Sequence, residues 1–73
     1  MEATMNDRRA SWADEALETF MTKTGCDGSD AISDLLCDLM HWCDQRGEDF
    51  DAELARARNH YTHEIANPET GGA

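Results

Sequence analysis

Basic residues are scarce in this chain. Its 73 residues include six Lys or Arg against 16 Asp or Glu, which gives a formal net charge of −10 at pH 7. Because a field of that sign repels phosphates, we do not expect direct binding of DNA or RNA. The same field attracts basic protein surfaces and can imitate nucleic acid in a groove that normally holds phosphates. Solubility is the other explanation for such a charge.

Long apolar runs are also missing. No stretch approaches the roughly 20 apolar residues of a membrane span, so we expect no membrane contact. Nothing near the N-terminus resembles a secretory signal. Three cysteines cannot all pair within one chain. We therefore expect Cys26, Cys37 and Cys43 to be reduced thiols in a cytoplasmic protein, with Cys43 in the core.

The motifs of common catalytic and metal sites are absent as well. The sequence has no CxxC, no HExxH, no Gly-rich phosphate loop and no nucleophile motif around a serine. His60 and His63 are one helical turn apart, as are Cys37 and His41, but two ligands on one helix make only half of a zinc site. We expect no resident metal or cofactor and a non-enzymatic function.

The densest run of large apolar residues is SDAISDLLCDLMHWCDQRG, residues 29–47. Its apolar positions recur every three or four residues, the period of a helix rather than a strand, and they are Ile32, Leu35, Leu36, Leu39, Met40 and Cys43. Ser29 or Asp30 can cap the start of this helix, and Gly47 can end it in a left-handed conformation. The apolar arc is about 160° wide. Such a width predicts contact with two or more neighbours, from the same chain or from a second copy.

Helical periodicity continues on both sides of this segment. An apolar stripe predicts a helix over about residues 5–22, capped by Thr4 with Asp7 or by Ser11 with Asp14. The third helix, over about residues 50–66, has its apolar stripe at Phe50, Leu54, Ala57, Tyr61 and Ile65. Asp49 is a good N-cap for that helix. Pro68 stops it, and we expect a disordered tail over residues 67–73.

These patterns predict one all-α domain of three helices, over about residues 5–22, 30–46 and 50–66. Short loops favour antiparallel neighbours, so the second and third helices should form an antiparallel hairpin with the first packed across them. The wide apolar arc predicts a homodimer, and its contact should include Trp12, Leu36, Met40 and Trp42. The alternative is a monomer in which the first helix covers the arc.

Carboxylates occupy the opposite face of the central helix. Asp30, Asp34 and Asp38 stack one turn apart, although like charges at this spacing repel by a few tenths of a kcal/mol per pair. Glu15 and Glu18 lie one turn apart on the first helix. We expect all five to bind a basic partner surface, and a merely solvated face is the alternative. If the two acidic faces opposed each other, Glu15, Glu18, Asp34 and Asp38 could hold Mg²⁺ and act on phosphates.

The segment DLLCDLMHWCDQRGEDFDAELARARNHY resembles the C-terminal helix pair of MazG-type all-α nucleotide pyrophosphohydrolases. Glu15-Ala-Leu-Glu18 is similar to the ExxE metal pair of that family, and Asp34 matches the acidic residue before its apolar run. Ala31 stands where the second metal pair, an ExxD, has its glutamate. The resemblance implies an all-α, dimer-prone fold and, as an alternative function, a Mg²⁺-dependent nucleotide pyrophosphohydrolase of reduced size.

The run DLMHWCD, followed by GEDFDAELARARNHY, resembles small acidic helical proteins of phages and mobile elements. Some small acidic phage proteins inhibit host defence, anti-CRISPR proteins among them. This resemblance implies an inhibitor that offers an acidic helix face to a host nucleic-acid-binding complex. A purely structural subunit of a dimeric assembly is the third function that the sequence leaves open.

Overall fold

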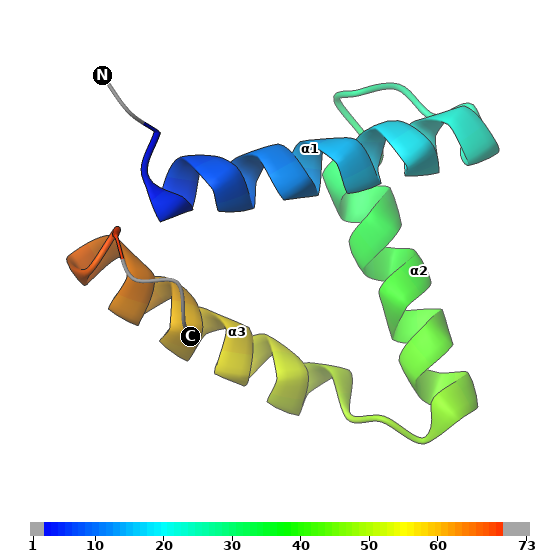
Figure 1. Ribbon diagram of the computed structural model, residues 1–73. Helices are drawn as coiled ribbons and strands as arrows, with labels where there is room; N and C mark the ends of the chain where they lie inside the picture. Colours follow the sequence, from blue (N-terminus) through cyan, green and yellow to red (C-terminus); the bar gives the residue numbers. More distant parts are fainter. Residues whose placement is uncertain (1–2, 70–73) are drawn as a thin grey trace.

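Three α-helices form the part of the chain that this computed structural model describes, residues 3–69: α1 (Met5–Thr24), α2 (Ala31–Arg46) and α3 (Phe50–Ala66) (Figure 1). Residues 3–69 contain no strand, so the predicted all-α, three-helix fold is confirmed. Within this range, no helix combines the length and the apolar character needed to cross a membrane. Residues 70–73 of the predicted tail lie outside the described residues.

Each helix begins at a short polar residue. At α1 the Thr4 hydroxyl accepts a hydrogen bond from the Asp7 backbone N–H at 3.1 Å, and the Asp7 carboxylate accepts one from the Thr4 N–H at 2.9 Å. This reciprocal capping box selects Thr4 over Ser11 as the cap of α1. At α3 the Asp49 carboxylate accepts from the Ala52 N–H, as predicted. Asp30 occupies the N-cap position of α2 without a side-chain capping bond.

Glycine residues end the first two helices. Gly25 has φ 73° and Gly47 has φ 71°, and the backbone N–H of each donates to the carbonyl four residues earlier. The left-handed conformation costs residues with a Cβ about 1–2 kcal/mol, so glycine suits both positions. The predicted left-handed end of the central helix at Gly47 is confirmed.

The three helices lie along the sides of an open triangle (Figure 1). The C-terminal half of α1 crosses the start of α2, and α3 leaves the end of α2 and returns toward the start of α1. There the Asn6 side-chain amide donates to the Glu64 carbonyl at 2.9 Å, and Arg9 Nε lies 3.5 Å from Glu64 Oε1. Since α2 and α3 diverge from the turn at Gly47, the predicted antiparallel hairpin is open rather than packed along its length.

Little apolar surface is buried by this arrangement. Within residues 3–69, the buried hydrophobic residues are Ala31 and Cys43, and Cys43 therefore lies in the core as predicted. The radius of gyration is 14.1 Å, against about 11 Å for a compact domain of this length. The large apolar side chains left exposed come from all three helices and are Trp12, Ile32, Leu36, Leu39, Met40, Trp42, Leu54, Tyr61 and Ile65.

Replacing Gly47 by alanine should destabilise the fold by about 1 kcal/mol, because a Cβ disfavours its positive φ. The matched control is Gly28→Ala. Gly28 does not have positive φ, and its new Cβ would meet only Met21 Sδ at 3.9 Å, an ordinary contact. Urea unfolding followed by far-UV circular dichroism measures both variants. Equal midpoints for the two would contradict the left-handed helix end at Gly47.

The Cys43 thiol should react more slowly with iodoacetamide than the thiols of Cys26 and Cys37. Burial raises the pKa of Cys43, and nearby carboxylates such as Glu48 and Glu53 raise it further, so less of the reactive thiolate is present. Peptide mass spectrometry after a timed pulse measures each site. Urea should remove the difference, and a Cys43 that reacts fastest in the folded chain would refute its burial.

Candidate functional site

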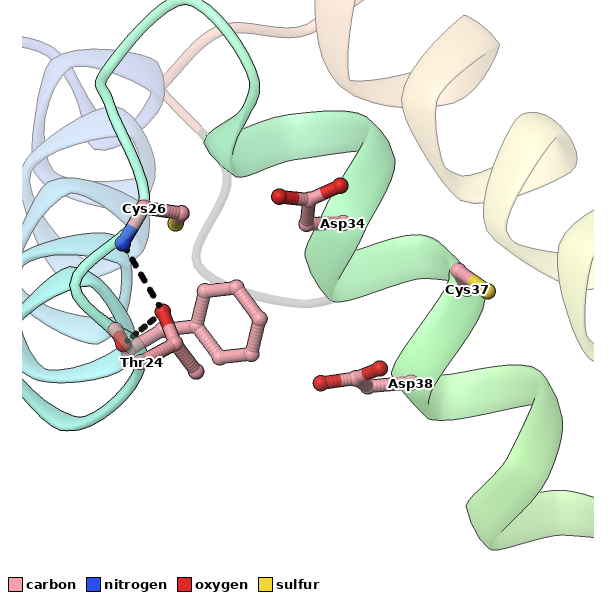
Figure 2. Close-up of a pocket in the computed structure, with 6 residues that line it drawn as sticks. Thr24, Cys26, Asp34, Cys37 and Asp38 are labelled. Carbon is pink, nitrogen blue, oxygen red and sulfur yellow. Dashed lines mark hydrogen bonds between the residues drawn. The ribbon is translucent and has the colours of Figure 1, made fainter.

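Two neighbouring carboxylates mark the corner where α1 crosses α2. Asp34 and Asp38 lie one turn apart on α2, and both are directed toward the end of α1 and the loop that follows it (Figure 2). Together they line a hollow, which we call the acidic hollow, whose full lining is Phe20, Thr24, Cys26, Asp34, Cys37 and Asp38.

Hydrogen bonds fix the end of α1 and the start of the following loop, which lie opposite Asp34 and Asp38 in the acidic hollow. The Thr24 hydroxyl donates to the Phe20 carbonyl at 2.9 Å and accepts from the Cys26 backbone N–H at 3.3 Å (Figure 2). The left-handed Gly25 lies between these residues and turns the chain out of α1. The last turn of α1 and the start of the loop are therefore fixed relative to each other.

The acidic hollow is negatively charged, and its local compensation is the N-terminal dipole of α2, since Asp34 lies in the first turn of that helix. Within residues 3–69, neither Asp34 nor Asp38 forms an ion pair, and Lys23 in the last turn of α1 does not pair with them. The C-terminal end of α1 adds the negative end of a helix dipole beside them. This corner is consequently suited to receive a cationic group from outside.

The arginines of α3 do not reach the acidic hollow. Arg56 pairs with Glu53 one turn before it on the same helix, and this hydrogen bond lowers the pKa of Glu53. Arg58 is exposed and forms no ion pair within the described residues. The possibility that an arginine of the same chain neutralises Asp34 and Asp38 is thus not realised in this structure.

The other predicted site residues lie elsewhere. Glu15 and Glu18 are exposed on α1, and at 100° per residue Glu18 lies about 200° around the helix from Phe20, which lines the acidic hollow. Asp30 is exposed at the start of α2. The structure therefore brings together two of the five carboxylates that we expected to share one surface.

This separation also bears on the Mg²⁺ alternative. Its ligand set would be Glu15, Glu18, Asp34 and Asp38. Across the described residues, no group of three or more His, Cys, Asp or Glu side chains is placed to hold a metal ion. The four carboxylates thus do not converge on one metal site.

An apolar groove adjoins the acidic hollow along the same helix pair. It is lined by Ala13, Ala16, Leu17, Ile32, Leu35, Leu36 and Leu39, and we call this set the apolar groove. A shallower depression lined by Phe20, Leu35, Asp38, Leu39 and Trp42 connects it to the acidic hollow. The sequence predicted the apolar residues on the α2 side of this groove, but it did not indicate that Phe20, Thr24 and Cys26 adjoin the acidic pair. Helical period places Phe20 on the same face of α1 as Ala16 and Leu17, but it does not show which neighbour that face meets.

The four residues predicted for a dimer contact are all exposed in the single chain. Trp12 is 57% exposed, Leu36 42%, Met40 50% and Trp42 49%. The Arg46 guanidinium lies 5.0 Å from the centroid of the Trp42 ring, a cation–π contact that orders this edge of α2. These side chains are therefore available to a partner.

The arrangement thus combines an anionic corner with a neutral apolar groove, and within residues 3–69 no three His, Cys, Asp or Glu side chains are grouped to hold a metal ion. A comparison of the chain with known protein families, with curated proteins and with solved structures found no match.

Proposed function

We propose that this chain is a non-enzymatic interaction protein that presents the acidic hollow to a basic surface of a nucleic-acid-binding protein. One observation carries the proposal: Asp34 and Asp38 lie side by side without an ion pair inside residues 3–69. A pair of carboxylates in a chain with net charge −10 attracts Lys and Arg side chains from a distance and binds them on contact.

The lining of the acidic hollow suits such side chains in a second way. Phe20 provides an aromatic surface beside the carboxylates, and Trp42 lies on the adjoining depression with Asp38. Lys and Arg have apolar stems and charged ends, so a stem can pack on the rings while the end meets the carboxylates. The guanidinium of Arg can also bind a carboxylate through two parallel hydrogen bonds.

A basic surface that normally binds phosphates is the partner that this chemistry fits best. An acidic protein that occupies it competes with nucleic acid for the same Lys and Arg side chains. In its most specific form, the proposal is an anti-CRISPR-like inhibitor from a phage or mobile element that blocks a host nucleic-acid-binding complex. A purely structural dimeric subunit is the second candidate, favoured by the exposed apolar groove.

Charge reversal at Asp34→Lys with Asp38→Lys should weaken partner binding at least about tenfold, because two charge-assisted contacts become repulsive. The control, Glu48→Lys with Glu69→Lys, makes the same change in net charge at exposed positions outside the acidic hollow. Both variants and the parent chain are immobilised, incubated with host lysate and quantified by mass spectrometry of the captured proteins. Circular dichroism should show equal helix content.

If the acidic hollow mimics nucleic acid, duplex DNA should release the captured proteins. The amount of captured protein should also fall steeply between about 50 and 200 mM salt. Equal capture by the parent chain and the Asp34, Asp38 variant would rule out the acidic hollow as the binding site. Equal loss in the control variant would show that net charge alone attracts the partner. Capture that DNA does not compete with would exclude a phosphate-binding site on the partner.

A further inference from the structure

We infer that a second copy of this chain covers the apolar groove, so that two chains form a dimer through α1 and α2. This inference does not rest on the proposed binding of a basic partner, which concerns the acidic hollow, and it deepens the second candidate, the dimeric subunit, by naming the interface. Four observations carry it: the accessible area of the chain, its small core, the neutral lining of the groove and the exposed residues that surround it.

The accessible surface of the chain is 5851 Å², whereas a compact monomer of 8.2 kDa exposes about 4,500 Å². The difference is about 1,300 Å² per chain. If two chains cover that surface on each other, they bury about 2,600 Å² in total, within the range of obligate homodimer interfaces. The excess area is thus of the size that a stable dimer needs.

The small core identifies the occupant as a second copy. With Ala31 and Cys43 as the buried hydrophobic residues of the range 3–69, the single chain buries too little apolar surface to offset the conformational entropy lost on folding. A surface that covers the exposed apolar side chains must therefore be present whenever the chain folds. A second copy is made at the same place and time, whereas a partner met only later cannot supply that contact.

The lining of the groove allows two strongly acidic chains to meet. All seven residues that line it are uncharged, and the nearest carboxylate of the lining sets, Asp38, belongs to the depression at its edge. Two chains of net charge −10 can therefore pack here without burying a carboxylate. The acidic hollow and the groove share no lining residue.

Exposed residues extend the groove along both helices. Trp12 lies one turn before Ala16 on α1, and Met40 lies one turn after Leu36 on α2. Trp and Met are enriched at the centres of interfaces, where they supply large apolar contacts. In a two-fold dimer the same patch serves on both subunits, so each residue contributes twice.

The test compares Leu36→Glu with Gln45→Glu, which adds the same charge at an exposed position of α2 outside the groove. Sedimentation equilibrium of the full chain should give twice the 8.2 kDa chain mass for the parent and for Gln45→Glu. Leu36→Glu should weaken association at least about 100-fold, because it places an unpaired charge in the contact.

A second measurement keeps the inference testable if Leu36→Glu fails to fold. The thermal midpoint of the parent chain should rise with protein concentration, since dissociation accompanies the unfolding of a dimer. A parent chain of 8.2 kDa with a midpoint independent of concentration overturns the inference. If the Leu36→Glu variant remains a dimer, the dimer interface does not lie on the apolar groove. If the parent chain has a mass above that of two chains, it does not form a closed dimer.

Discussion

Burial of apolar surface is the constraint on which the rest of this structure depends. The three helices meet at the corners of a triangle, with α1 crossing α2 and Glu64 of α3 bound to the start of α1. This arrangement leaves large apolar side chains of every helix in contact with water. A chain of 73 residues has little core to spare, because small domains bury a smaller share of their surface than large ones. The groove between α1 and α2 is the apolar surface of the open triangle that we infer a second copy covers.

The packing of α1 against α2 also creates the acidic hollow. Phe20 and Leu35 line the depression that joins the hollow to the groove, so one helix crossing shapes both surfaces. The turn at Gly25 directs Cys26 back toward α2, and Thr24 holds that turn by its two hydrogen bonds. A change in the crossing of α1 and α2 would consequently alter the anionic corner and the apolar groove together, whichever of them a partner contacts.

The acidic pair and the apolar groove adjoin on this chain, and Asp38 lies on the depression between them. The lining of the groove carries no ionisable residue, while Asp34 and Asp38 face the end of α1. The two cations of α3 that could have neutralised them are engaged locally, as Arg56 is with Glu53, or exposed, as Arg58 is. The dimer contact and the basic-partner contact that we propose would therefore use different lining residues, although the two surfaces adjoin.

The helices themselves followed from the sequence. The apolar period, the cap at Asp49, the left-handed Gly47 and the burial of Cys43 all rest on neighbours within a few residues along the chain or on one helix face. The sequence left the cap of α1 open between Thr4 and Ser11, and the structure selected Thr4. The candidate functional site could be predicted from the sequence only in part. Helical period put Asp34 beside Asp38, but it could not show that Glu15 and Glu18 point elsewhere, because the rotation of one helix relative to another depends on contacts between distant residues. Those contacts, between α1 and α2 and between Glu64 and the start of α1, decided that the triangle is open, that α2 and α3 diverge, and that an apolar groove lies beside an acidic hollow.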